Sequence, residues 1–239
     1  MTVTHFSAGD YRFLAAPGRP FSSGVVAEVG FDLVHARFFR PLPLEAGLEA
    51  AARHVESTGR PVTAIGAFEL RIPRPFSEEG FAEFNAGYVR RLERMGLTAQ
   101  PDLPTGRTNV VPIFDVVSEP SVYAFTYTVP APAQEPGDRP AFRLSGSAET
   151  RRDGPLEDRF RSVVETLTGR LAELGVRWED STAINLYAAA QAPREVEADM
   201  VAAFGLAALH GITWMPALPP VTGLQFEIDA RRVGSELIL

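Results

Sequence analysis

One order of predicted elements occurs twice along this chain, once on each side of a proline-rich segment at 131–140. On each side the sequence predicts strand, helix, strand, helix and two further strands. The segment between them, APAQEPGDRP, is polar and has no hydrophobic periodicity, which predicts a linker or a long surface loop. We therefore expect two copies of one small α/β unit, in 1–130 and 141–239.

The first copy contains two predicted helices separated by a strand. Ser77 has the side chain of a helix N-cap and is followed by two glutamates, which a helix N-terminus favours. In the central strand the apolar Phe68 and Leu70 alternate with Glu69 and Arg71, a pattern typical of one buried face. The predicted elements are helices over 43–59 and 77–96 and strands over 62–72, 108–117 and 121–129.

The second copy repeats this order around a strongly amphipathic helix over 156–174, which Gly175 ends. Leu186 of the following strand falls at the same place as Leu70 in the first copy. The other predicted elements are strands over 141–148, 181–188, 211–215 and 224–233 and a helix over 194–209.

This order of elements predicts the architecture. Strands joined through helices of this length pair in parallel through right-handed crossovers. Two helices per unit can lie on one face of its sheet, so the other face must be covered by another sheet. We expect an α/β (α+β) fold of two tandem units, each a mixed sheet with two helices on one face. The open faces then pack on each other or on neighbouring subunits, which favours a homo-oligomer.

The composition excludes several kinds of chemistry. No cysteine is present, so disulfides, thiolate catalysis and cysteine-ligated metal sites are excluded. No lysine is present either, which excludes a lysine Schiff base and a P-loop phosphate site. Every permanently charged cation is therefore an arginine, whose planar fork suits carboxylate binding.

Charge and hydropathy argue against two classes of partner. The net charge is −7, with acids and bases interleaved along the chain. Arginines occur together only in runs of two, which are too short to follow a phosphate backbone. No apolar run approaches the roughly 20 residues of a membrane helix. The first residues lack a basic start and an apolar signal core. We expect no nucleic acid, no membrane, and a cytoplasmic protein.

Residues 142–233 resemble the RidA/YjgF family of small enamine/imine deaminases. The matching features are Leu144-Ser145-Gly146 after an early strand, the helix that ends at Gly175, the strand TAINLY, and Leu218-Pro219 before FEIDA at 226–230. The first half is similar but more distant, through FAEFNAGYVRRL at 81–92 and Thr105-Gly106-Arg107-Thr108. A tandem pair of such halves also resembles the chorismatases, which are hydrolases.

The resemblance implies an assembly of three units with ligand sites in clefts between neighbours, and no metal or organic cofactor. It also implies an arginine that binds the substrate carboxylate and a glutamate that positions water. The first half keeps the arginine, Arg107, but has no acid around Tyr123. The second half keeps the glutamate, Glu227, but has His210 or Gly211 at the arginine position. A complete site therefore requires Arg107 and Glu227 to meet across an interface.

Each candidate site residue also has a simpler interpretation. Arg107 could pair with a surface acid, and Glu227 could lie on a solvated strand face. His210 is either a weak anion contact or a histidine favoured by a helix C-terminus. Tyr123 belongs to an aromatic strand face that is more typical of sheet packing. Two polar residues that could also bind substrate lie at the rim implied by the resemblance, Asn109 and Ser145.

Two functional hypotheses of different classes follow. In the first, the chain is a cofactor-independent hydrolase or deaminase acting on a small carboxylated imine or enamine, with Arg107 holding the carboxylate and Glu227 orienting water. In the second, it is a non-catalytic RidA-like protein that binds a small acidic metabolite or serves in an interaction. A chorismatase-like hydrolase is a further alternative. Among oligomers, the resemblance favours a homotrimer.

Overall fold

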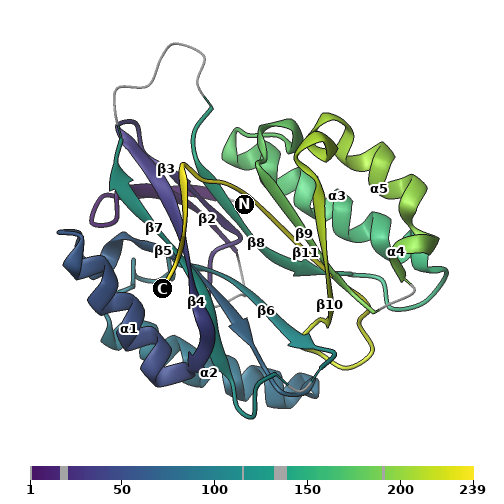
Figure 1. The fold of residues 1–239 in the computed structure, drawn as a ribbon, viewed down its shortest axis with the longest axis horizontal. Coiled ribbons are helices and arrows are strands. Elements are labelled where there is room, and N and C mark those ends of the chain that lie inside the picture. The colour runs from purple at the N-terminus through teal and green to yellow at the C-terminus, as the bar shows by residue number, and fades with distance from the viewer. Residues whose placement is uncertain (1, 17–20, 115, 132–138, 190–191) are drawn as a thin grey trace.

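The computed structural model describes residues 2–16, 21–114, 116–131, 139–189 and 192–239, and the predicted linker falls largely outside them. The helices lie in two groups on either side of a central region of strands (Figure 1). One group is α1 (Leu44–Ser57) and α2 (Glu78–Arg94), and the other is α3 (Leu156–Leu174), α4 (Ala192–Glu195) and α5 (Glu197–Phe204). No helix among these residues is long and apolar enough to cross a membrane.

The strands form one sheet in the order β1-β2-β3-β8-β11-β9-β10-β6-β5-β7-β4-β12. The first half contains β1 (Thr2–Phe6), β2 (Tyr11–Ala15), β3 (Gly24–Ala27), β4 (Phe31–Pro43), α1 (Leu44–Ser57), β5 (Ile65–Arg71), α2 (Glu78–Arg94), β6 (Gly106–Pro112) and β7 (Ser121–Pro130). The second contains β8 (Phe142–Ala148), α3 (Leu156–Leu174), β9 (Ala183–Ala188), α4 (Ala192–Glu195), α5 (Glu197–Phe204), β10 (Ile212–Leu218), β11 (Phe226–Arg232) and β12 (Ser235–Ile238). This mixed α/β architecture is the fold class that the sequence predicts.

Strand pairing follows the same order in the two halves. The first half has β4-β7-β5-β6 and the second has β8-β11-β9-β10. In both, the two strands joined by the second helix are parallel, β5 with β6 and β9 with β10. The remaining pairs in both are antiparallel. A short antiparallel contact between β10 and β6 joins these two four-stranded parts, called the two sheets below, into the single strand order.

The ends of the chain cross over between the halves. The N-terminal strands β1, β2 and β3 extend the sheet of the second half, because β3 pairs with β8. The C-terminal strand β12 returns to the first half and pairs in parallel with β4. The division into 1–130 and 141–239 remains a prediction about sequence order, and each sheet contains strands from both parts.

Most predicted helices are confirmed, and their ends follow known rules. Ser77 accepts a hydrogen bond from the Gly80 amide at 3.1 Å and so caps α2. Gly175 adopts a left-handed conformation at the end of α3. The continuous helix predicted over 194–209 is wrong. The chain forms α4, α5 and a 3-10 segment there, because Gly205 has φ +48° and ends α5.

The open faces of the two sheets pack on each other. Two apolar cores lie between helices and strands, one in each half, and a third lies around β2 and β3. Glu69 and Arg71, predicted to alternate with a buried face, are themselves buried. The reason is that the second half covers the outer face of β5. The region between the sheets is largely polar.

An ionic network occupies part of this region. The Arg143 guanidinium contacts Asp229 at 2.8 Å and Glu69 at 3.0 Å, so it connects the two halves. His35 lies 2.8 Å from Glu69, and Thr108 donates a 2.8 Å hydrogen bond to Asp229. Burial alone would raise the pKa of Glu69, but attraction to Arg143 and His35 outweighs it and holds that pKa well below its usual range. Glu69 is therefore charged, and both carboxylates have partners within the network.

Candidate functional site

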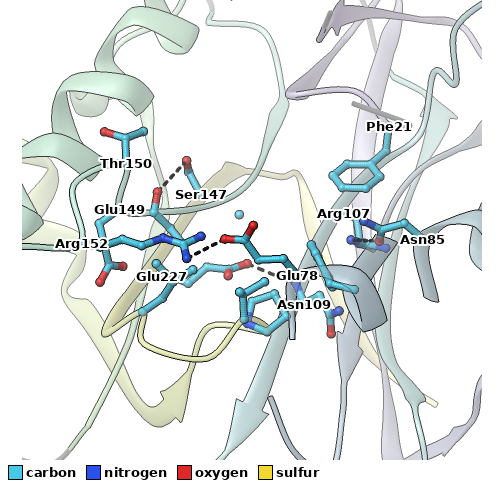
Figure 2. Close-up of a pocket in the computed structure, with 16 residues that line it drawn as sticks. Phe21, Glu78, Asn85, Arg107, Asn109, Ser147, Glu149, Thr150, Arg152 and Glu227 are labelled. Atoms are coloured by element: carbon cyan, nitrogen blue, oxygen red, sulfur yellow. Dashed lines mark hydrogen bonds and ion pairs between the residues drawn. The ribbon is translucent and has the colours of Figure 1, made fainter. Parts of the chain in front are cut away.

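A cavity of about 570 Å³ opens beside this network, between the two halves (Figure 2). The first half contributes residues of α2 and β6 to its lining. The second half contributes β8, the segment that follows it, the loop before β11, and β11 itself. Arg107 and Glu227 both line this cavity, so the fold brings together the two groups that the sequence leaves in different halves.

Arg107 is a buried cation without an ion-pair partner among the described residues. Its Nη2 donates to Asn85 at 2.8 Å, whereas its Nη1 is buried and has no hydrogen-bond partner in the described part of the chain. The guanidinium lies 4.1 Å from the ring centre of Phe21 and 5.0 Å from that of Tyr88. Burial lowers the pKa of Arg107 to about 10, so it is still a cation at neutral pH. A buried charge in this state favours an anionic ligand.

Glu227 is a buried carboxyl with an elevated pKa. Its Oε1 accepts a hydrogen bond from the Asn109 backbone amide at 3.2 Å. Burial raises the pKa of Glu227 to about 8, against the opposing effects of that hydrogen bond and of Arg107. A buried carboxyl whose pKa is near neutral can both donate and accept a proton, as general acid–base catalysis requires.

Gly146 allows Glu227 to occupy this position. A Cβ atom at Gly146 would overlap Oε1 of Glu227 and would also lie 3.0 Å from its Cδ and 3.1 Å from Cγ2 of Thr108. The glycine of the Ser145-Gly146 pair therefore has a steric explanation here.

Asn109 and Ser145 have different surroundings. Asn109 lines the cavity, and both polar atoms of its side chain are buried without a hydrogen-bond partner among the described residues, a state that a polar ligand would relieve. Ser145 does not line the cavity. Its hydroxyl donates to the Ser22 carbonyl at 2.8 Å and accepts from the Arg107 amide at 3.2 Å. It therefore holds the backbone of Arg107.

His210 and Tyr123 lie outside this cavity. His210 ends the 3-10 segment before β10 and lines a separate surface hollow with Arg231 and Glu236. The Tyr123 hydroxyl accepts a 3.2 Å hydrogen bond from Arg37, and its ring lies 4.1 Å from the Arg71 guanidinium. The structure therefore does not bring these two residues together with Arg107 and Glu227.

The cavity also has charged residues that sequence reasoning did not select. Arg152, in the segment after β8, forms a 2.6 Å ion pair with Glu78, the first residue of α2. Glu149 accepts hydrogen bonds from the amides of Gln225 and Phe226 and so fixes the start of β11. In sequence these are ordinary loop and helix-end charges, without a pattern that marks them. Among the described residues no group of His, Asp and Glu side chains is arranged to hold a metal ion.

A family model described as 2-aminomuconate deaminase CnbZ matches residues 3–237. The chain belongs to the CnbZ family. A curated relative, the 2-amino-5-chloromuconate deaminase of Comamonas testosteroni, is 36% identical over 250 residues, and the alignment covers 98% of each protein. The match includes both halves, so the Arg107–Glu227 cavity lies within the region shared with the CnbZ family.

Two solved structures are similar to this CnbZ-family chain. One is a member of the YjgF/YER057c/UK114 family from Mycobacterium tuberculosis, with 21% identity, a TM-score of 0.32, and coverage of 39% of this chain and 78% of that one. The other is a chorismatase, with 14% identity, a TM-score of 0.48, and coverage of 87% of this chain and 77% of that one.

Proposed function

We propose that this protein is a hydrolytic deaminase of 2-aminomuconate-type substrates, which carry an amino group on an unsaturated carbon next to a carboxylate. The family description and the name of the 36% identical relative support this substrate class. The observation that carries the proposal is a single cavity with a buried, unpaired Arg107 and a buried Glu227 of near-neutral pKa.

Arg107 binds the carboxylate next to the reacting carbon. The unpartnered Nη1 supplies a charge-assisted hydrogen bond, and the Asn85 contact fixes the plane of the guanidinium. The Asn109 side chain, whose amide and carbonyl are both unpaired, hydrogen-bonds the substrate amino group or the attacking water. Ser145 has a supporting role through the Arg107 backbone.

Glu227 transfers protons. In the first step its carboxyl donates a proton to a chain carbon of the dienamine, while the nitrogen lone pair forms the C=N bond. In the second step the resulting carboxylate takes a proton from water as the water oxygen bonds to the carbon that carries nitrogen. This alternation requires a pKa close to the working pH, which the value of about 8 provides.

The last step releases ammonia. The nitrogen of the carbinolamine takes the proton back from Glu227 and the C–N bond breaks. The hydroxyl oxygen then forms the carbonyl, and its proton returns to the Glu227 carboxylate. One water is consumed, one ammonia and one 2-oxo acid are formed, and Glu227 ends protonated as it began.

An assay of ammonia release from 2-aminomuconate tests the proposal, with 2-iminobutyrate and chorismate as comparison substrates. We expect ammonia and loss of the diene absorbance with 2-aminomuconate, in a one-to-one ratio. Turnover of chorismate alone would support the chorismatase-like alternative. Binding of a carboxylate without turnover of any substrate would support the non-catalytic alternative. Either result would overturn the proposal.

We also propose that the two halves are copies of one unit and that the protein forms a homo-oligomer, with a trimer favoured. The equal order and sense of strand pairing in the two halves support the first proposal. Light scattering coupled to size-exclusion chromatography tests the second, and a monomeric mass across the micromolar range would contradict it.

A further inference from the structure

Two arginines line the cavity, Arg107 in its buried part and Arg152 at its exposed rim, and they come from opposite halves of the chain. Arg107, from β6, is 3% exposed. The Arg152 side chain, from the segment between β8 and α3, is 51% exposed and pairs with Glu78 at the cavity rim. In the view of Figure 2, Glu227 lies between Arg152 and Arg107. The lining of the cavity therefore includes two cations as well as the proton-transferring carboxyl.

We propose that Arg152 binds the second carboxylate of a dicarboxylate substrate, and that the Glu78 carboxylate occupies this position until the substrate displaces it. This inference rests on the proposed function and specifies the substrate class of the same site. It makes Arg152 a specificity-determining residue that does not touch the reacting carbon.

Displacement of Glu78 is inexpensive. The Glu78 side chain is 70% exposed, and an ion pair between such exposed groups contributes little to stability because water screens it. After release, the Glu78 carboxylate stays in the first turn of α2, where the helix dipole favours an anion. The incoming carboxylate replaces one acid with another at Arg152, so this arginine keeps a carboxylate partner.

The exchange discriminates between substrates by charge. A monocarboxylate of equal length places an uncharged end at the rim, so it leaves the Arg152–Glu78 pair in place or separates it without a replacement. A dicarboxylate uses both arginines. The cavity is thus expected to prefer diacids, and the preference is expected to depend on Arg152.

Muconate and sorbate provide the test, because they share one dienoate chain and differ by a carboxylate in place of a methyl group. Their affinities for the full-length protein are measured by calorimetry, with R152Q, E78Q and, as the matched control, R151Q at the neighbouring exposed arginine. We expect the unmodified protein to prefer muconate by about tenfold or more, equivalent to ~1.4 kcal/mol. We expect R152Q to abolish that preference with sorbate affinity unchanged, E78Q to strengthen muconate binding, and R151Q to change neither.

A preference for muconate that survives in R152Q overturns the inference, as does equal binding of both ligands by the unmodified protein. The proposed function fails separately. If 2-aminomuconate releases no ammonia while the Arg152-dependent preference is intact, the deaminase assignment is wrong and the diacid site stands.

Discussion

The backbone amide of Asn109 donates a 3.2 Å hydrogen bond to Oε1 of Glu227, although the two residues belong to different halves of the chain. The donor lies on β6 and the acceptor on β11. A backbone donor favours the charged carboxylate, yet burial raises the pKa of Glu227 to about 8. Glu227 therefore belongs to the second half, is held in place by a backbone amide of the first half, and is protonated at neutral pH.

Replacement of Glu227 by glutamine keeps the shape of the side chain and removes the proton transfer. We expect kcat for 2-aminomuconate to fall by about 10²- to 10⁴-fold, the usual contribution of a positioned acid–base group. Muconate affinity should change little, because Arg107 and Arg152 remain. E56Q, at an exposed glutamate of α1, is the control. Unchanged turnover in E227Q would remove Glu227 from the mechanism.

The activity should depend on the protonated form of Glu227. Since the first step donates its proton, kcat/KM should fall as pH rises through about 8, the value to which burial raises the pKa of Glu227. The slope should approach one decade per pH unit. A profile that is flat between pH 6 and 9.5, with no solvent isotope effect, would contradict this assignment.

The same group makes stability depend on pH. The folded-state pKa of Glu227 is about 8 against 4.5 for an ordinary glutamate, so the folded state binds more protons between those values. Stability therefore decreases as pH rises through this window. Urea unfolding at pH 6 and pH 9 should show the unmodified protein losing stability relative to E227Q, by at most about 3 kcal/mol. An equal pH dependence in both proteins would show that Glu227 is not buried as described.

Arg107 should determine substrate affinity. In R107Q the loss of a buried charge-assisted hydrogen bond should raise KM by about 10- to 100-fold. The matched control is R53Q, because the Arg53 side chain is 68% exposed on α1 and pairs only with Glu49 in the described structure. Initial-rate kinetics on both variants would decide the matter. A KM for R107Q equal to that of R53Q would exclude Arg107 as the anchor.

Gly146 should be intolerant of a methyl group. G146A places a Cβ against the Glu227 carboxyl, so kcat should decrease with the fold retained. Gly169 in α3 has open space at its Cβ, and G169A should leave activity unchanged and raise stability by up to about 1 kcal/mol. Thermal unfolding and ammonia release, measured together, separate the two effects. Full activity in G146A would mean that Glu227 can move freely.

The sequence predicts the helices well, but it predicts poorly the terminal strands that pair with the other half of the chain. The helix over 156–174 is confirmed because its apolar stripe is long and a glycine ends it. No strand is predicted by its bounds before residue 43, so the long β4 is missed, and so are the short β1, β2, β3 and β12. These four short strands are four or five residues long, and β12 is exposed throughout, so neither length nor alternation distinguishes them from loops.

Part of the cavity lining could be anticipated from the sequence, whereas the roles of these residues stay predictions. Arg107, Asn109 and Glu227 meet because β6 and β11 lie on the two sides of one interface between the halves. His210 lies at the end of the 3-10 segment before β10 and Tyr123 lies on β7, and these two strands are not neighbours in the strand order of the described residues. Arg152 and Glu78 acquire a role only from tertiary placement. The residue pattern within one half does not show which of its strands will face the strands of the other half.

The exchanged ends of the chain make the two halves mechanically interdependent. Because β3 joins β8 and β12 joins β4, each half is completed by an arm that is covalently part of the other. Dividing the gene at the proline-rich segment 131–140 would therefore yield two fragments. Each fragment would carry the terminal strands that complete the sheet of the other. Co-expressed fragments would recover the native strand pairing only by binding each other through β3 and β12. The two fragments would then behave as a split protein, and neither would fold as an independent domain.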